Sequence, residues 1–429
     1  MAELVIAAVR GRRVWDSRGR PTVEAEVTSS DGTVGRAIAP AGASRGSHEA
    51  VDLRDGGPLV AGLGVARAVA NVNGPIADAL AGRPLADQLG VDAALCNLDA
   101  TADKSVLGGN ATIAVSMAAL HAAAATAGVP LWQYLAGDAA VSLPLPQIQI
   151  YGGGAHASRR VDLQDFMVQA VGAPTFDRAL EMTAEVYLAA GRRLESQGRL
   201  AGVADEGGWW PAFDSNEEAL GELVAAIEAA GLTPGDDVVI ALDVAASEFG
   251  AGGVYRLAHD DRTLGTGEMV ALVEGWVDRY PIASIEDPLA EDDLPGWVEL
   301  FARVGERVQI VGDDLLVTDA ARVRAAADAA ACNALLVKPN QAGTISETRA
   351  AFDAARAAGF ATIVSARSGE TEDVTIVHLA TGWDAGQLKV GSFARSERMA
   401  KWNEGLRIEE SLGSVARFAG RGALAGGDR

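Results

Sequence analysis

The chain has 429 residues, 49% of them hydrophobic, which is enough for large buried cores in two or three domains. Its 58 acidic and 36 basic residues give a formal net charge of −22, which argues against nucleic acid or an anionic membrane as the main partner. Two cysteines and no apolar run of about 20 residues exclude a disulfide scaffold and a membrane-spanning helix. No signal-like segment is found, so a cytoplasmic location is expected.

The first 137 residues indicate an α+β domain. Residues 3–40 alternate in the manner of strands, and a hairpin turn is predicted at Asp31 and Gly32. The Gly- and Ser-rich residues 41–50 indicate a loop, and two Ala-rich helical stretches follow, the second ending at Gly128. We place the domain boundary near residue 138.

Residues 138–429 indicate a β/α barrel. In the second half, apolar runs end in polar residues at intervals of about 25 residues, and Ala- and Arg-rich helical stretches separate them. The run-ending residues are Asp243, Glu286, Asp313, Lys338, Ser365 and Lys389. In such barrels the active site lies at the carboxyl ends of the strands. The fold class is therefore α/β, a C-terminal barrel capped by the N-terminal α+β domain.

Two segments before this regular part also carry polar residues. Residues 161–171 indicate a strand with Gln164 and Asp165 near its middle. Residues 202–211 indicate a Gly-rich loop that carries Asp205 and Glu206. A long helix is predicted between them, and a closing helix is predicted near the C-terminus.

Three carboxylates at three strand ends predict a Mg²⁺ site. Asp243, Glu286 and Asp313 offer hard oxygen ligands, with room left for water and substrate. Asp314 is an alternative to Asp313, because alternation along a strand lets only one of the two point inward.

Lysine use points to acid–base chemistry. Only Lys104, Lys338, Lys389 and Lys401 are lysines, and every other basic residue is arginine. Lysine can act as a base when burial and neighbouring cations lower its pKa, whereas arginine cannot. Lys338 is therefore a candidate general base.

Other polar residues near the predicted strand ends suit an anionic substrate. Lys389, Arg367 and Ser368 can bind phosphate or carboxylate through charge-assisted hydrogen bonds. Glu206 is a candidate general acid. His156 and Ser44 lie in loops, where a structural position is an equally good interpretation of either residue taken alone.

The motifs together resemble the enolase family along essentially the whole chain. WDSRGRPTVEAEV, AGASRGSHEAVDLRDG and DEGGWWP resemble the family's DSRGNPTVEVEV, SGASTGxxEAxELRDG and DEGGFAP. SIEDP, VGDDLLVT, KPNQAGT, RSGETED and GQLKVGS follow in the family's order. The resemblance implies a capping domain on a β/α barrel, a homodimer, and Mg²⁺-dependent dehydration of 2-phosphoglycerate, a small phosphorylated anion. The family is itself a standard example of an enolate stabilised by Mg²⁺ beside a lysine base.

The resemblance also implies residue roles. Asp243, Glu286 and Asp313 would bind one Mg²⁺, and Ser44 would bind a second that arrives with substrate. Lys338 would take the C2 proton, and Glu206 would assist loss of the C3 hydroxyl. The residues around the substrate would be Lys389 at its carboxylate, Arg367 and Ser368 at its phosphate, and His156, Gln164 and Asp165 in the pocket.

Several positions depart from the family pattern. A pocket histidine is replaced by Ala366, a catalytic-network glutamate by Asp165, and a loop threonine by Arg45. The asparagine of NGG is Gly152, and Trp209 and Trp210 stand where Phe-Ala is usual. These changes favour a specialised paralogue similar to carboxyphosphonoenolpyruvate synthase, of phosphinate antibiotic biosynthesis, in which Arg45 would contact a larger phosphorus substrate. The alternative is an ordinary glycolytic phosphopyruvate hydratase.

Two further alternatives are weaker. A non-catalytic enolase-like protein would have no reason to keep Lys338, Glu206 and the three carboxylates together. A cycloisomerase-like or racemase-like barrel enzyme would not explain the GAS, DEGG and RSGE motifs in one chain.

Overall fold

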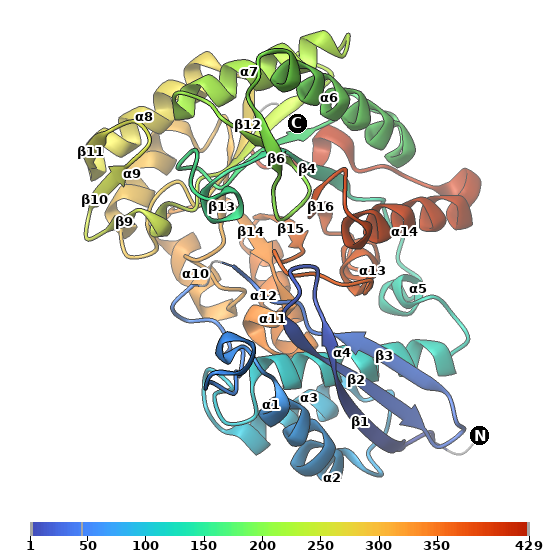
Figure 1. The fold of residues 1–429 in the computed structure, drawn as a ribbon. Helices are drawn as coiled ribbons and strands as arrows, with labels where there is room; N and C mark the ends of the chain where they lie inside the picture. Colours follow the sequence, from blue (N-terminus) through green and yellow to red (C-terminus); the bar gives the residue numbers. More distant parts are fainter. Residues whose placement is uncertain (1–2, 44–45, 427–429) are drawn as a thin grey trace.

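The computed structural model describes residues 3–43 and 46–426, except for the side chain of His156. The N-terminal part of the chain begins with an antiparallel sheet (Figure 1). Its strands are β1 (Ile6–Trp15), β2 (Pro21–Ser29) and β3 (Val34–Ile38), in that order. The predicted turn at Asp31 and Gly32 is confirmed, because it joins β2 to β3. The Thr33 amide donates to Asp31 Oδ1 at 2.9 Å and closes this turn.

A buried helix, α4 (Gly109–Thr126), connects the sheet to the rest of the molecule. It is apolar around nearly its whole circumference, as expected of a helix covered on all sides. It packs on β2 and β3 and on α11 (Pro339–Ala342) of the barrel. Gly35 permits the close approach of β3, because a Cβ there would lie 2.1 Å from the Ala122 amide nitrogen. The other N-terminal elements are η1 (Leu59–Gly62), α1 (Ala66–Asn71), the π-helical turn η2 (Val72–Ile76), α2 (Ala77–Leu80), α3 (Gln88–Asp99) and α5 (Leu131–Ala136).

Eight strands close into a barrel, as predicted. They are β4 (Leu145–Gly152), β5 (Asp165–Gln169), β8 (Val239–Asp243), β12 (Ile282–Glu286), β13 (Gln309–Gly312), β14 (Ala334–Val337), β15 (Ala361–Ser365) and β16 (Gly386–Ser392). Pairing of β16 with β4 completes the closure. The strands are almost wholly buried because side chains fill the barrel and helices cover it.

One strand runs against the others. β5 is antiparallel to both β4 and β8, so its first residue lies level with the last residue of β8, Asp165 beside Asp243. A strand is present within the expected range 161–171, but it is shorter, and the expectation that Gln164 and Asp165 lie near its middle is wrong. β5 begins only at Asp165, and its reversed direction brings its amino end to the face that holds the carboxyl ends of the other strands.

Helices surround the barrel, namely α6 (Phe176–Ser196), α7 (Asn216–Ala229), α8 (Thr266–Arg279), α9 (Leu294–Val304), α10 (Ala320–Asp328), α12 (Ile345–Ala357), α13 (Thr375–Gly382) and the predicted closing helix α14 (Ser396–Leu412). The expected loop over residues 202–211 is a hairpin instead, with β6 (Leu200–Val203) paired to β7 (Trp209–Pro211).

Minor elements are η3 (Gly154–Ala157), η4 (Ala246–Glu248), β9 (Gly250–Ala251), β10 (Val254–Leu257), β11 (Arg262–Gly265), η5 (Gly413–Val415) and η6 (Gly420–Ala423).

The N-terminal part caps a barrel helix directly. The first amides of α12 have no partners within the helix, as at every helix start. Ser116 on α4 accepts the Ile345 amide at 2.9 Å, and Asp92 on α3 accepts the Ser346 amide at 2.8 Å. The start of α12, which follows the strand end at Lys338, is thus fixed by the other part of the molecule.

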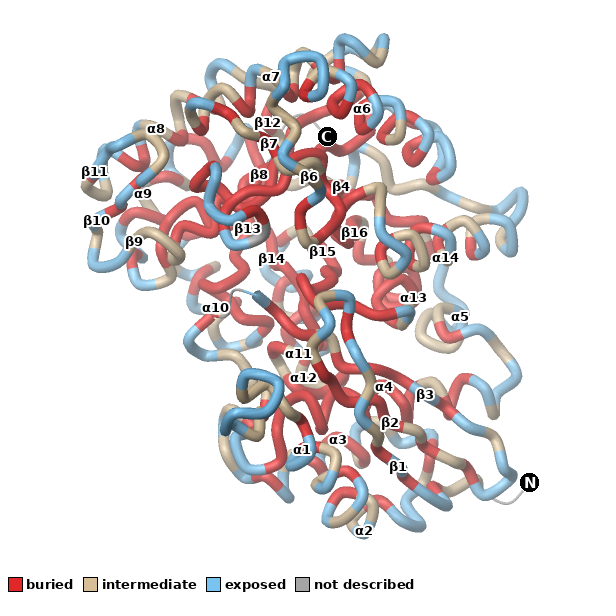
Figure 2. The backbone as a smooth tube through the Cα atoms, viewed as in Figure 1, coloured by how far each residue is buried: buried red, intermediate tan, exposed pale blue. Residues whose placement is uncertain are grey.

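Burial extends without interruption from the barrel into α4 and the N-terminal sheet (Figure 2). All four lysine side chains belong to this interior, since Lys104, Lys338, Lys389 and Lys401 are each buried. Within the described residues, no helix is both long and apolar enough to cross a membrane.

The buried His378 and the half-buried His121 meet where α4 packs near α13, and they make stability sensitive to acid. Burial lowers the pKa of His378 to about 4, although Glu404 opposes the shift. At neutral pH His378 is therefore uncharged, and its 3.5 Å approach to Glu404 is not an ion pair. His121, whose ring lies 6.4 Å from that of His378, also has a lowered pKa because of burial.

We predict that stability falls as pH drops from about 6.5 to about 4. In that window His378 is protonated in the unfolded chain and uncharged in the folded chain. The free energy of unfolding therefore falls by roughly 3 kcal/mol in total across the window. Thermal unfolding of His378→Gln across pH 4 to 7 should show a shallower loss than the wild type. His48→Gln, at an exposed histidine, is the control and should follow the wild type. Parallel pH profiles for wild type and His378→Gln would contradict the prediction.

Candidate active site

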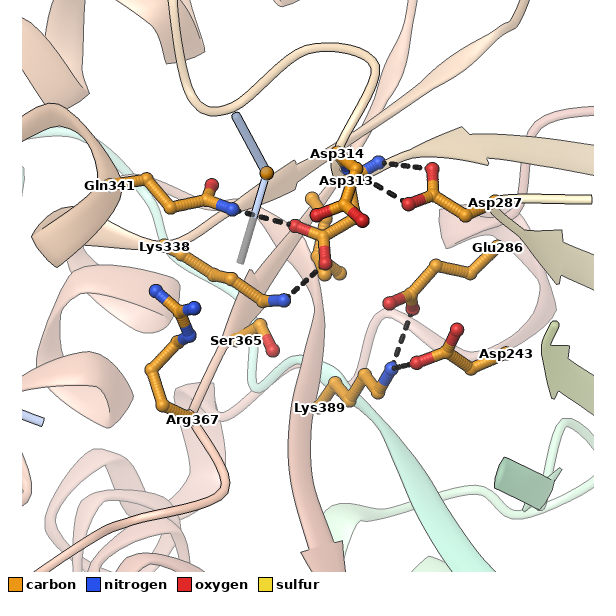
Figure 3. A network of polar contacts seen from close by, with 12 residues as sticks. Asp243, Glu286, Asp287, Asp313, Asp314, Lys338, Gln341, Ser365, Arg367 and Lys389 are labelled. Atoms are coloured by element: carbon orange, nitrogen blue, oxygen red, sulfur yellow. Dashed lines mark hydrogen bonds and ion pairs between the residues drawn. The ribbon is translucent and has the colours of Figure 1, made fainter. Parts of the chain in front are cut away.

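Three carboxylates gather at the carboxyl ends of adjacent parallel strands. Asp243 ends β8, Glu286 ends β12 and pairs in register with Asp243, and Asp313 directly follows β13 (Figure 3). All three are buried. Parallel strands in register bring their ends to one face, which is why residues far apart in the sequence meet there.

Two lysines lie among these carboxylates. Lys389 on β16 places Nζ 2.9 Å from Asp243 Oδ2 and 2.7 Å from Glu286 Oε2. Lys338, the residue after β14, forms an ion pair with Asp313 Oδ2. Gln341 Nε2 donates to the other Asp313 oxygen at 2.9 Å. The expectation that both lysines lie at the strand-end face is confirmed.

Lys338 does not have the lowered pKa of a neutral base in this arrangement. Burial alone lowers the pKa of Lys338, but the Asp313 charge more than compensates, so the pKa lies above its ordinary value. The pKa of Lys389 is likewise raised well above its usual range, because Asp243 and Glu286 outweigh burial. Both lysines are cations in this arrangement.

Asp313 and Asp314 have different surroundings, and these favour Asp313 as a ligand. Burial tends to raise the pKa of Asp313, but the combined opposite effect of Lys338 and the other nearby cations is larger. The pKa of Asp313 therefore lies below its ordinary value, and Asp313 stays ionised. Burial and the Asp313 charge raise the pKa of Asp314 to about 8. Both oxygens of Asp287 accept backbone amides, from Asp313 at 2.9 Å and from Asp314 at 2.8 Å. Asp287 therefore fixes the turn that carries both aspartates.

The arrangement fits a divalent cation. Within the described residues, the tightest group of ligand-type oxygens is Asp287, Asp313 and Asp314, whereas the predicted set is spread around the lysines. Asp287 already binds two amides, which leaves it poorly suited to a metal. Glu286 Oε1, by contrast, is buried and has no hydrogen-bond partner. Burial and the Asp243 charge raise the pKa of Glu286 well above its ordinary value. The negative charges of Glu286 and Asp243 therefore repel each other, and Mg²⁺ would neutralise them. The set Asp243, Glu286 and Asp313 stays a prediction.

The amino end of β5 forms another wall of the site. Gln164 Nε2 donates to Asp243 Oδ2 at 3.0 Å, while Gln164 Oε1 is buried with no hydrogen-bond partner. Asp165 contacts Gln149 on β4 and lies 3.7 Å from Lys389 Nζ. Asp165 thus belongs to the charged network even though its side chain is short.

One small cavity brings most of the predicted residues together. Its lining includes Glu206, from the β6–β7 turn, and the β15 end with Ala366, Arg367 and Ser368. The rest of its lining is formed by Gln164, Asp165, Asp243, Lys338, Ser365, Lys389 and Val390. Ser44, Arg45 and the His156 side chain lie outside the described residues.

Sequence reasoning missed several residues that support the site. Gln341 and Asn340 follow Lys338 in the first turn of α11, where the KPNQ spacing was a usable signal. Gln149 interrupts an apolar strand, which also marks it. Glu49 forms an ion pair with Arg367, and no local pattern indicates this contact.

Comparisons with known proteins agree with this geometry. Residues 6–135 match the model of the enolase N-terminal domain, and residues 140–425 match that of the enolase C-terminal TIM barrel domain. The chain belongs to the enolase family. It is 50% identical over 423 residues to "Enolase 1" of Desulfitobacterium hafniense (strain Y51), covering 98% of this chain and 97% of that protein. It is also 50% identical over 420 residues to "Enolase" of Rubrobacter xylanophilus (strain DSM 9941 / JCM 11954 / NBRC 16129 / PRD-1), covering 98% of each.

Membership makes this enolase-family chain an enzyme, a lyase of a Mg²⁺-dependent family. The predicted fold class, a barrel with a separate N-terminal domain, is confirmed. The expected resemblance to carboxyphosphonoenolpyruvate synthase receives no support, because the curated relatives at this identity are enolases.

We predict that Mg²⁺ stabilises the protein through Asp313 and not through Asp314. Relative to EDTA, millimolar Mg²⁺ should raise the wild-type melting temperature by a few degrees, since a ligand that binds only the folded state stabilises it. Asp313→Asn should lose most of this shift, because it removes a charged ligand. Asp314→Asn is the matched control and should keep it. Loss of the shift in Asp314→Asn alone would assign the ligand to Asp314.

Proposed function

We propose that this enzyme interconverts 2-phosphoglycerate and phosphoenolpyruvate. The observation that carries the proposal is the composition of one buried cavity. A lysine paired to a carboxylate, a second lysine, an arginine and an acidic residue line it together. These are Lys338, Lys389, Arg367 and Glu206, and the substrate has a carboxylate, a phosphate, an acidic C2 proton and a C3 hydroxyl for them to engage.

Lys338 is the proposed base. Its neutral amine takes the C2 proton, and the electrons of the C–H bond pass into the carboxylate to give an enolate. Mg²⁺, held by Asp243, Glu286 and Asp313, would supply positive charge beside that carboxylate. With its charge shared in this way, Asp313 would hold Lys338 less strongly, and the pKa of Lys338 would then lie closer to neutral pH.

Glu206 is the proposed acid, and the other residues hold the substrate. Glu206 gives a proton to the C3 hydroxyl, which leaves as water while the enolate electrons form the C2–C3 double bond. Lys389 binds the carboxylate, and Arg367 and Ser368 bind the phosphate through charge-assisted hydrogen bonds. Asp165 and Gln164 orient Lys389 and Asp243.

Further features of the enzyme are proposed from the sequence and from its resemblance to the family. Ser44 would hold a second Mg²⁺ that enters with substrate, and His156 would line the pocket. A homodimer, a cytoplasmic location and a domain division near residue 138 complete the proposal.

Purified wild-type protein with Mg²⁺ should convert 2-phosphoglycerate to phosphoenolpyruvate, followed by ultraviolet absorbance of the product. Lys338→Ala should lose at least about a hundredfold in kcat, the usual scale of a general base. Lys338→Arg is the matched control, because it keeps the charge but cannot act as a base at neutral pH. Near-normal kcat in Lys338→Arg would overturn the assignment. Absence of wild-type turnover would overturn the proposed function and favour a changed substrate.

Ala366 tests whether the replaced pocket histidine matters. Ala366 is buried at the cavity, and its amide donates to the Lys389 carbonyl at 2.8 Å. If the enzyme is an ordinary hydratase, Ala366→His should change kcat/KM for 2-phosphoglycerate by less than about threefold. Ser365→Ala, next to it, serves as a control for disturbance of the strand end. A rise of tenfold or more in Ala366→His would instead favour the specialised paralogue.

A further inference from the structure

Glu49 crosses from the N-terminal part of the chain to the proposed phosphate residue. Arg367 Nη1 lies 2.9 Å from Glu49 Oε2, and Nη2 lies 3.2 Å from Glu49 Oε1. Both side chains are buried, with 3% of Arg367 and 7% of Glu49 exposed. The carboxylate and guanidinium therefore meet in two parallel hydrogen bonds shielded from water, the strongest form of this pair.

Other contacts fix the pair in place. Asn340 Oδ1 accepts from Arg367 Nη1 at 3.0 Å, and the Gly46 amide donates to Glu49 Oε1 at 3.0 Å. Gln341 Nε2 reaches Glu49 Oε1 at 3.3 Å and Asp313 Oδ1 at 2.9 Å. Glu49 thus ties the segment of residues 46–50 both to Arg367 and, through Gln341, to a proposed metal ligand.

The charge of Glu49 opposes a phosphate. Arg367 stays protonated at all physiological pH, so its affinity for an anion depends on what already neutralises it. Glu49 neutralises Arg367 and accepts hydrogen bonds from both of its Nη atoms. A phosphate brought to the same guanidinium would meet a carboxylate of like charge at close range in a water-poor site, where such repulsion is strong.

We propose that Glu49 is a positioning residue that acts as an internal competitor for the phosphate subsite. It occupies Arg367 until a phosphorylated ligand displaces it, and displacement releases residues 46–50 and Gln341 from that contact. This inference rests on the proposed function, because it takes Arg367 as the phosphate residue. A ligand that also engages Lys389 and the proposed metal site can offset the cost of displacement, whereas a bare phosphate ion makes fewer contacts and therefore binds the wild type weakly.

Glu49→Gln tests the competition, because it keeps the shape of the side chain but removes its charge and replaces one of the two oxygens that accept from Arg367 with an amide nitrogen that cannot accept. Inorganic phosphate should bind Glu49→Gln about tenfold more tightly than wild type, measured by isothermal titration calorimetry with Mg²⁺ present. Glu49→Asp keeps the charge and should stay within about threefold of wild type. Glu291→Gln is the matched control, because Glu291 accepts the Ser47 amide at 3.3 Å in the same segment and has no contact with Arg367 among the described residues. It should not change phosphate affinity.

Steady-state kinetics separate competition from structural damage. Removing a competitor strengthens substrate and transition-state binding equally, so KM for 2-phosphoglycerate should fall about tenfold in Glu49→Gln while kcat stays within about threefold. Damage to the site would raise KM. In the Glu49→Gln/Arg367→Gln double variant, the gain in phosphate affinity should vanish, because the competition acts through Arg367.

Unchanged or weaker phosphate binding in a folded Glu49→Gln protein would overturn the inference, with folding checked by thermal unfolding. A gain in phosphate affinity that persists without Arg367 would overturn it as well. The calorimetry needs no turnover, so it distinguishes the two proposals. A wild-type protein that does not turn over 2-phosphoglycerate, but whose Glu49→Gln variant gains phosphate affinity through Arg367, would refute the proposed function and leave the competition standing.

Discussion

The mutual neutralisation of buried carboxylates and lysines is the interaction on which the active-site face depends. Asp243 and Glu286 share Lys389, and Asp313 pairs with Lys338. Taking such charges out of water costs several kcal/mol for each ion unless opposite charges and hydrogen bonds compensate. The pairs neutralise much of this charge, while Glu286 keeps one buried oxygen with no hydrogen-bond partner. The face therefore still favours a cation such as Mg²⁺.

The same pairing sets the chemistry of the proposed base. Lys338 is held as a cation by Asp313, so it cannot accept a proton in this arrangement. In the proposed mechanism its activation would depend on redistribution of the Asp313 charge, which would link base strength to occupation of the proposed metal site. A free lysine at the same strand end would lack this dependence.

The N-terminal part of the chain contributes to the site more than a cover. Asp92 and Ser116 cap α12, and α4 packs against α11, the turn that follows Lys338. Glu49 reaches the phosphate residue and Gln341. The surroundings of Lys338, Arg367 and Asp313, the proposed base, phosphate residue and metal ligand, therefore all depend on residues outside the barrel, and a barrel expressed alone would lack these contacts.

The sequence by itself determined the fold class, the barrel rhythm and most of the cavity lining, because strand ends in successive β/α units fall on one face and carry their residues there. It could not determine the direction of β5, since an apolar strand has the same pattern in either orientation. It also could not determine where β5 begins, and so it placed Gln164 and Asp165 in the middle of that strand. Nor could it show that Lys338 is held as a cation or that Glu49 meets Arg367, 318 residues away. Those contacts arise only when the two parts of the chain pack together, because charge pairing depends on distance in space and leaves no local pattern.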